Sequence, residues 1–431
     1  MTTTKNNEHK KLNFSSEREQ SQACLNSAEH EKNQGRKVLN VPNLRFKEFQ
    51  GEWKEERLAD IADLYKGTGI SKEQLSGDGE PCILYGELYT KYKSETIREV
   101  ISKTNIDNTK LVRSKANDVI IPCSGETAED IATARCVLNG NILLGGDLNI
   151  IRLHGYDGAF MSYQLNGRRK YDIAKVAQGV SVVHLYGEHL KGVKTFNPCL
   201  EEQKKIAKLL SLLDERIATQ NKIIEDLKKL KSAIIEKHYS QVKKRTTCIA
   251  DLGEPFSVGS LAKDDLTEIG SPCVIYGELF TTYGEIIFHI ESCTNKTDGM
   301  ILSKKGDLLF PSSTTVDAMS LIAPSVINVD GVVLGGDMFG IHISHNYNSQ
   351  YLSYYFNHIA KKQLAKFAKG STIIHLHYKD IEKAKLLLPS LEEQNRMAKC
   401  LVALDKKVSV EQNLLSSLSC QKSYLLQQMF I

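Results

Sequence analysis

Residues 198–203 read Pro-Cys-Leu-Glu-Glu-Gln, and residues 389–394 read Pro-Ser-Leu-Glu-Glu-Gln. The similarity extends beyond these hexapeptides, because ten of twenty positions are identical between residues 198–217 and 389–408. In both places the motif opens a long segment in which apolar residues recur at alternating steps of three and four. This is the spacing of a coiled-coil seam. The sequence therefore predicts two long, related helices, each preceded by a proline that a helix start tolerates.

The same repeat is found in the segments before the two helices. Cys82-Ile-Leu-Tyr-Gly-Glu-Leu-Tyr89 returns 191 residues later as Cys273-Val-Ile-Tyr-Gly-Glu-Leu-Phe280, and Leu144-Gly-Gly-Asp147 returns as Leu334-Gly-Gly-Asp337. Short β-rich runs here alternate with glycine and asparagine, which is typical of strands joined by loops. We predict an α+β fold with two pseudo-repeated α/β domains, separated by two long helices that form an antiparallel coiled coil. The expected organisation is a disordered N-terminal tail (1–40), a docking segment (41–57), a first domain (58–198), a central helix and linker (199–248), a second domain (249–389) and a C-terminal helix (390–431).

Polar residues interrupt the two seams at matched places, with Gln220 and Lys231 in the first helix and Glu411 and Lys422 in the second. One interpretation is that each helix packs only on its own domain. The alternative is that the two helices pair with each other, which the narrow and regular stripe favours. Because a domain lies between them in sequence, we expect the pairing to be antiparallel.

Composition limits the class of protein. The 431 residues are 41% hydrophobic and 25% charged, as in globular proteins, and no apolar run is long enough for a membrane span. We expect a cytoplasmic protein that does not enter a membrane. The ten cysteines form no Cys-x-x-Cys pair, so neither structural zinc nor a disulfide framework is expected. The sequence also contains no P-loop, no complete G-x-G-x-x-G and no H-E-x-x-H, so we expect no catalytic residue, cofactor or metal in this chain.

The loops differ between the two copies. Such a difference is expected of two related domains that bind two different targets. Small hydroxyl and amide side chains suit contacts to base edges, and Arg and Lys suit contacts to phosphates. The candidate DNA-binding residues in the first domain are Ser124, Gly125, Thr127, Arg168, Arg169, Lys170, Gln178, Ser181 and His184. Those in the second domain are Ser313, Thr314, Lys361, Lys362, Lys369, Ser371, Thr372 and His375. For any single residue, a solvated loop without a ligand is the simpler alternative.

The order of motifs resembles the specificity (S) subunit of type I restriction-modification enzymes. The resemblance rests on Leu-Arg-Phe-x-x-Phe-x-Gly-x-Trp at 44–53 and on the Leu-Glu-Glu-Gln helix starts at Leu200 and Leu391. It covers residues 41–431 and implies that each domain reads one half of a bipartite site in double-stranded DNA. The implied partners are modification (methyltransferase) subunits, two in number, which methylate adenine with S-adenosylmethionine, and restriction subunits. No cofactor is implied in this chain itself.

Two other classes of function remain open from the residues alone. A coiled-coil adaptor that binds only proteins is compatible with the domain charges, because residues 58–198 carry 17 basic and 17 acidic side chains and residues 249–389 carry 11 and 15. A free-standing DNA methyltransferase or nuclease is disfavoured by the missing cofactor and metal motifs. DNA binding in the presence of modification subunits separates the adaptor from the specificity subunit, and methyl transfer by the purified chain alone would indicate the enzyme.

Overall fold

The computed structural model describes residues 39–107, 109–179 and 182–431. The predicted tail at 1–40 therefore lies outside the described residues, apart from its last two. Contacts divide the chain into two units. The first unit extends to Leu212 and also includes Lys422–Ile431, and the second unit is Leu213–Gln421. Each unit thus contains one of the two related domains and a part of each long helix.

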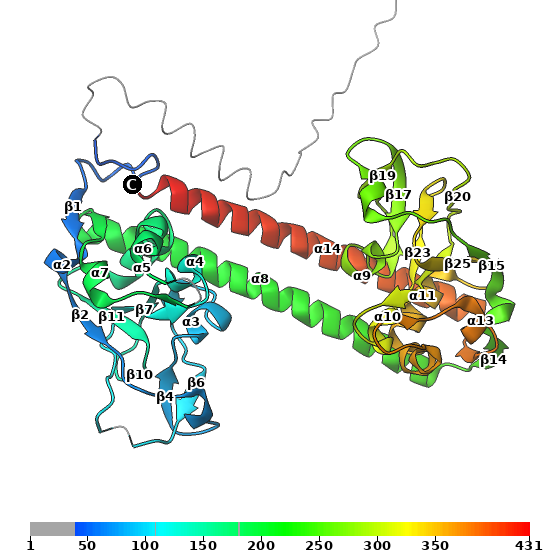
Figure 1. Cartoon of the computed structure of the whole chain (residues 1–431), viewed down its shortest axis with the longest axis horizontal. Coiled ribbons are helices and arrows are strands. Elements are labelled where there is room, and N and C mark those ends of the chain that lie inside the picture. The colour runs from blue at the N-terminus through cyan, green and yellow to red at the C-terminus, as the bar shows by residue number, and fades with distance from the viewer. Residues whose placement is uncertain (1–38, 108, 180–181) are drawn as a thin grey trace, which may run out of the picture. The chain divides into compact units, whose positions relative to one another are not determined.

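The first domain is a mixture of short helices and strands (Figure 1). Its strands are β1 Lys54–Arg57, β2 Ala62–Lys66, β3 Leu75–Ser76, β4 Glu80–Ile83, β5 Thr96–Ile97, β6 Ser102–Thr104, β7 Asp118–Pro122, β8 Ser124–Gly125, β9 Arg135–Val137, β10 Leu143–Leu144, β11 Leu148–Leu153, β12 Val183–His184 and β13 Lys194–Asn197. Its helices are α2 Leu58–Ile61, α3 Glu87–Thr90, α4 Ala128–Ile131, α5 Gly158–Asn166, α6 Lys170–Val176 and α7 Gly187–Lys191. The long helix α8, Leu200–Gln241, follows.

The second domain repeats this order. Its strands are β14 Arg245–Cys248, β15 Gly253–Ser257, β16 Leu266–Thr267, β17 Ser271–Ile275, β18 Ile286–Ile287, β19 Ser292–Thr294, β20 Ile301–Leu302, β21 Leu308–Pro311, β22 Ser313–Thr314, β23 Ser325–Ile327, β24 Val333–Gly335, β25 Met338–Ile343, β26 Ile374–His375 and β27 Lys385–Leu388. Its helices are α9 Glu278–Thr281, α10 Ala318–Leu321, α11 Ser349–His358, α12 Lys361–Leu364 and α13 Tyr378–Ile381, and the long helix α14 is Leu391–Gln428.

Both domains are built on the same sheets. A five-stranded sheet has the order β2-β11-β7-β9-β5 in the first domain and β15-β25-β21-β23-β18 in the second. A second sheet has the order β10-β4-β6-β3 in the first domain, and its counterpart β16-β19-β17-β24-β20 gains the edge strand β20. The matching strand orders confirm the predicted pseudo-repeat and the α+β class.

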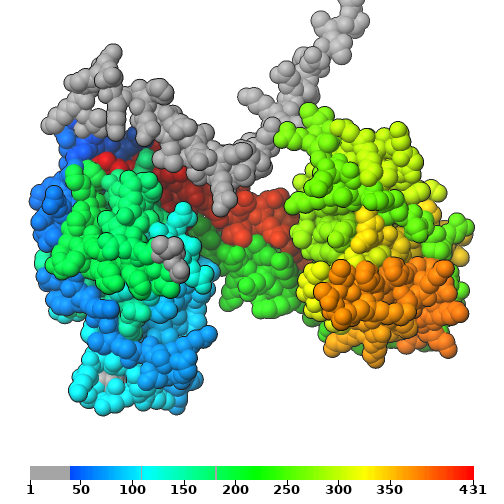
Figure 2. Space-filling model, in the orientation of Figure 1, coloured from blue at the N-terminus to red at the C-terminus, as the bar shows by residue number. Residues whose placement is uncertain are grey.

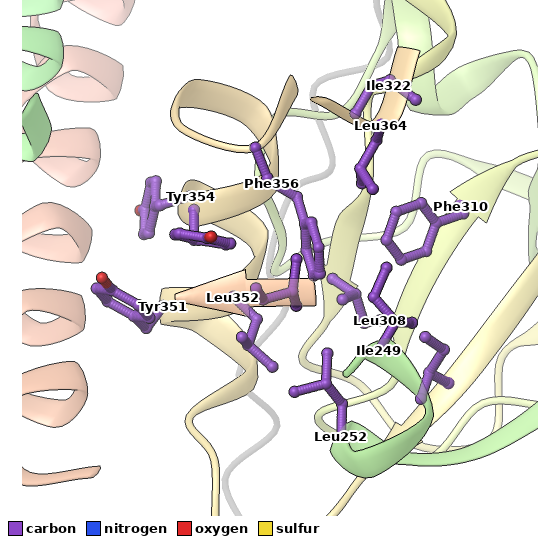
Figure 3. Packing of buried hydrophobic residues seen from close by; sticks show 14 of the residues in the cluster. Ile249, Leu252, Leu308, Phe310, Ile322, Tyr351, Leu352, Tyr354, Phe356 and Leu364 are labelled. Atoms are coloured by element: carbon purple, nitrogen blue, oxygen red, sulfur yellow. The ribbon is translucent and has the colours of Figure 1, made fainter. Parts of the chain in front are cut away.

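Each domain has its own apolar core. In the second domain, Leu308 and Phe310 of β21 pack with Leu352 and Phe356 of α11, and all four are buried. Figure 3 shows that Phe356 points from α11 toward the strands, whereas Tyr354 of the same helix points toward a long helix. Helix α11 therefore has two buried faces, one on its own sheet and one on the helix pair.

The two long helices pair with each other in antiparallel fashion. In the second unit, the Gln220 side-chain amide donates to the Glu411 carbonyl oxygen over 3.1 Å and also to its carboxylate. Farther along α8, His238 lies 3.1 Å from Glu393, near the start of α14. As residue numbers increase along α8, the numbers of their partners on α14 decrease. This confirms the antiparallel coiled coil. Gln220 is the repeat counterpart of Glu411, so this bond joins two equivalent positions.

In the first unit, the segment before β1 packs on the ends of both helices. The Trp53 ring is 2% exposed and contacts Phe160 of α5 and Phe430, which follows α14, edge-on. The Arg45 guanidinium donates two hydrogen bonds of 2.7 Å to Glu202 in the first turn of α8. The chain entering the first domain is thereby attached to both helix ends.

The Gln220–Glu411 pair gives a stability prediction. Replacing both residues with Leu removes a polar pair from an apolar seam, and apolar residues at such positions pack without desolvating a carboxylate. We expect the double variant to melt a few degrees above the wild type in calorimetry. We also expect the register between the two helices to be less well defined. This would appear as a broader distribution of distances between spin labels placed on the two helices.

The single substitution Glu411→Leu is the control for this test. It leaves the buried Gln220 amide without its carboxylate acceptor, so we expect a lower melting temperature than in the wild type. A double variant that melts below the wild type would contradict the account of the seam.

Candidate nucleic-acid interface

A tight hairpin forms the centre of the candidate site in the second domain. Lys369 and His375 exchange backbone hydrogen bonds of 2.9 and 2.7 Å, which close the intervening loop. Gly370 has a φ of +121°, and a Cβ at this position would lie 2.0 Å from the Ile373 carbonyl oxygen. The turn therefore requires glycine.

The hairpin lies next to a loop segment that diverges between the two copies and next to a motif that is repeated in both. Strand β22 pairs with β26 so that Ser313 lies opposite His375. The Ser313 hydroxyl donates to the Asp337 carboxylate over 2.8 Å, and the Ser312 amide donates to the Asp337 carbonyl oxygen over 2.7 Å. Asp337 ends the repeated Leu-Gly-Gly-Asp motif. Three segments far apart in the sequence thus meet at one surface.

A cavity of about 540 Å³ opens at this surface, and its lining residues are Ser312, Asp337, Lys369, Gly370, His375, His377 and Asp380. The rings of His375 and His377 are exposed and stacked, with centroids 6.1 Å apart. The Lys369 ammonium lies 2.5 Å from Asp380 and lowers the pKa of that carboxyl. In Figure 2 the orange surface of this unit corresponds to the chain around residues 361–388. The site is therefore open, polar and of mixed charge.

The first domain has the same arrangement. Gln178 and His184 exchange backbone hydrogen bonds of 2.9 and 2.7 Å. Gly179 has a φ of +128°, and its Cβ would lie 2.1 Å from the Val182 carbonyl oxygen. The predicted contact residue Ser181 lies outside the described residues. The described part of this loop is thus closed in the same way as its counterpart.

Strand pairing extends this correspondence. Ser124 lies opposite His184, as Ser313 lies opposite His375 in the second domain. The Ser124 hydroxyl donates to Asp147 over a longer distance of 3.4 Å. The exposed His184 ring stacks on Tyr186, with centroids 6.1 Å apart. The framework is common to both domains, and its exposed side chains differ.

Sequence reasoning missed four residues of this framework: Asp147, Tyr186, Asp337 and His377. The two aspartates belong to a motif that the sequence reveals as a repeat, without indicating what it contacts. Tyr186 and His377 each lie two residues after the predicted histidine. Both lie just beyond the short strand that contains this histidine and have extended backbone, in which alternate residues share one face, so this spacing could have identified them.

Several predicted residues do not join the framework. The Thr127 hydroxyl accepts a hydrogen bond of 3.0 Å from the Asp130 amide and caps α4. Arg168 donates to the Gln427 carbonyl oxygen over 3.0 and 2.7 Å, and Arg169 donates to the Ile431 carbonyl oxygen over 2.8 Å. These two arginines therefore hold the end of α14, a structural role that spacing alone does not reveal.

The remaining predicted residues are placed as follows. Lys170 begins α6, and Lys361 and Lys362 begin α12. Thr314 pairs with Ile374 at the base of the hairpin, and Gly125 takes the matching place in the first domain opposite Val183. Ser371 and Thr372 are exposed in the hairpin loop.

The geometry of the site suits binding. The Ser313 hydroxyl donates to Asp337, so its proton is not directed to His375 as it would be in a nucleophile activated by imidazole. Among the described residues, no group of three or more His, Cys, Asp or Glu side chains could hold a metal ion. No helix in the described part of the chain has the length and apolarity needed to cross a membrane. Hydroxyl, imidazole, amide and ammonium groups at one open edge supply both donors and acceptors.

Comparison with known proteins identifies the family. Residues 50–229 and 248–419 match the family described as type I restriction modification DNA specificity domain. The chain is 24% identical over 397 residues to the MjaVIII type I restriction enzyme specificity subunit of Methanocaldococcus jannaschii. The aligned region covers 85% of this chain and 90% of that relative. It is also 24% identical over 421 residues to the putative MjaX specificity subunit of the same organism, covering 87% and 92%.

A solved structure agrees with the fold. The crystal structure of the S subunit of a type I restriction-modification system from M. genitalium matches with a TM-score of 0.61 at 18% identity, over 91% of this chain and 99% of that one. The matches to the family model span most of the chain and include both domains. The chain therefore belongs to the type I restriction-modification specificity subunit family.

The hairpin glycine gives a second prediction. Gly370→Ala places a Cβ against a carbonyl oxygen at a left-handed φ, and strain of this kind costs about 1–3 kcal/mol. We expect chemical unfolding to show a loss of stability of this size. The matched control is Gly277→Ala, because no atom lies within 4 Å of a Cβ at Gly277 and its φ is −62°. Equal stability of the two variants would contradict the role given to Gly370.

Proposed function

We propose that this chain is the DNA-recognition subunit of a type I restriction-modification complex, in which each domain reads one half of a bipartite target. The observation that carries the proposal is the framework found in both domains, a hairpin and a serine–aspartate pair that present different side chains at matched positions. Gln178 in the first domain corresponds to Lys369 in the second, and Tyr186 corresponds to His377.

The chemistry of these differences supports two unlike half-sites. A glutamine side chain can donate to and accept from the edge of adenine in the major groove, whereas a lysine ammonium donates to the acceptors of guanine. An exposed tyrosine and an exposed histidine also differ in the groups they offer. Loops of this kind on a common framework can change target without changing fold.

The low net charge of the domains supports the proposal that other subunits contribute to DNA binding. The net charges of 0 for residues 58–198 and −4 for residues 249–389 provide little attraction for a phosphate backbone. We infer that two modification subunits supply most phosphate contacts, carry S-adenosylmethionine and methylate adenine. Restriction subunits would cleave DNA in the same complex, which would act in the cytoplasm. In this account the chain binds DNA and directs the chemistry, and no catalytic residue or cofactor is assigned to it.

The hairpin of the second domain provides the test. Lys369→Gln replaces a cationic donor with a neutral amide and should alter the bases preferred in one half-site. Because one good base contact discriminates by about 1–3 kcal/mol, we expect methylation of the original target to fall about tenfold or more. The methylated motif is read by sequencing DNA from cells that express the variant with its modification subunits.

The control for this experiment is Lys383→Gln. Lys383 is an exposed lysine of the same domain that does not line the cavity, so its replacement removes the same charge and should leave the motif and rate unchanged. A Lys369→Gln motif and rate equal to the wild type, or a change in both half-sites, would contradict the proposal. A methylome that is the same with and without the gene would instead favour the protein-binding adaptor.

A further inference from the structure

A partly buried ion-pair cluster connects the second domain to both long helices. The Lys231 side chain of α8 is 12% exposed, and its ammonium lies 2.9 Å from the Glu285 carboxylate and 2.8 Å from the Asp405 carboxylate. Glu285 lies immediately before β18 of the domain, and Asp405 lies on α14. A single ammonium thus joins three elements that are far apart in the sequence.

Neighbouring side chains complete the cluster. His358 lies 2.9 Å from Glu285 through its Nε2 atom, and the Tyr354 hydroxyl donates to Asp405. The Ser353 hydroxyl donates to the Glu285 carbonyl oxygen over 2.7 Å, which also fixes the backbone at this point. Figure 3 shows Tyr354 pointing from α11 toward the long helices. Each carboxylate therefore has two partners, as buried charges require.

The cluster is charged at neutral pH. Burial alone would raise the pKa of Glu285, but the hydrogen bond to His358 and the charge of Lys231 outweigh it and lower the pKa to about 2. Burial would likewise lower the pKa of Lys231, but Glu285 and Asp405 raise it. The contribution of Glu285 to stability is complete above its ordinary pKa of 4.5 and is lost only as the pH falls toward 2.

The first unit contains a related cluster. Lys422 of α14 lies 2.5 Å from Glu95, which precedes β5, and its ammonium lies over the Tyr163 ring at 5.9 Å. The Ser162 hydroxyl donates to the Glu95 carbonyl oxygen over 2.9 Å. In both units the lysine comes from the long helix that follows the other domain. Each domain is thereby attached to the helix of the opposite repeat.

The two lysines occupy positions of the seam where an apolar residue would pack better. A buried ion pair is weak evidence for stability, and the best-attested use of a polar group in a helix seam is to select one register. Sliding α8 by one heptad would move the Lys231 ammonium by ~10 Å. Glu285 and Asp405 would then lose their shared partner, so such a register is disfavoured.

We propose that these two clusters, Lys231 with Glu285 and Asp405 and Lys422 with Glu95, fix the position of each domain along the helices and so select the spacer length between the two half-sites. This inference rests on the proposed function. Lys231 and Lys422 act as positioning residues, because their ammonium groups contact carboxylates of the domains, Glu285 and Glu95. Their loss should therefore change which spacers are accepted and leave the bases read unchanged.

The test uses the complex of the full chain with its modification subunits. The variant carries Lys231→Met and Glu285→Gln, which remove the charges and keep similar side-chain volumes. The control carries Lys296→Met and Asp265→Asn, which remove an exposed ion pair of the same domain, at 3.1 Å. Methylation rates are measured on DNA with the native spacer and with spacers one base pair shorter and longer.

We expect the rate on the altered spacers, relative to the native one, to rise about tenfold or more in the cluster variant and to stay unchanged in the control. A folded cluster variant that discriminates between spacers as sharply as the wild type would overturn the inference. If this variant does not fold, the pair Lys422→Met and Glu95→Gln is tested in the same way. Failure of both to fold would assign the clusters to stability alone and would equally overturn it.

These outcomes are distinct from a failure of the proposed function. If the wild-type complex methylates no bipartite motif, the proposed function is wrong, whatever the variants do. If the wild type recognises two half-sites at one spacing and the cluster variants keep that spacing, only the inference about the clusters is wrong.

Discussion

The seam between α8 and α14 is the constraint on which both domains depend. Each helix is a continuous segment that contributes to both units, so neither unit is built from one repeat alone. The hydrogen bond between Gln220 and Glu411 joins equivalent positions of the two repeats near the middle of both helices. Apolar residues such as Ile206 and Leu210 contribute burial, whereas the polar pair limits the registers in which the helices can pair. The helix of one repeat therefore pairs with the helix of the other repeat.

The two domains combine a common framework with different surfaces. The left-handed glycines Gly179 and Gly370 close the same hairpin in both domains, and the carbonyl oxygens of Asp147 and Asp337 accept matching backbone hydrogen bonds. These residues are tied to backbone conformation and backbone hydrogen bonds, so they cannot vary freely. The exposed side chains around them do not set the backbone conformation. Exposed loop side chains of this kind can be replaced while the hairpin keeps its shape.

Much of this organisation could be predicted from the sequence, because the repeat exposes it directly. The seam spacing and the Leu-Glu-Glu-Gln starts predict helices that begin at Leu200 and Leu391, as the structure has them. The contacts of single side chains were harder to predict. Arg168 and Arg169 form a basic cluster that indicates phosphate binding, yet they donate to the carbonyl oxygens of Gln427 in α14 and of Ile431, which follows it.

That pairing joins residues about 260 positions apart, so no local pattern could indicate it. The sequence shows Lys231 and Lys422 as polar interruptions of the seam. It does not show their partners, because Glu285 and Glu95 lie in the domains.

The proposed function requires that each domain read one half-site independently of the other. The most direct measurement exchanges residues 58–198 for the corresponding domain of another family member and sequences the methylated motif in cells that also express the modification subunits. The account predicts that one half-site is replaced and that the second half-site is retained. If both half-sites change, or if neither changes while methylation continues, the two domains are not independent readers and the account is wrong.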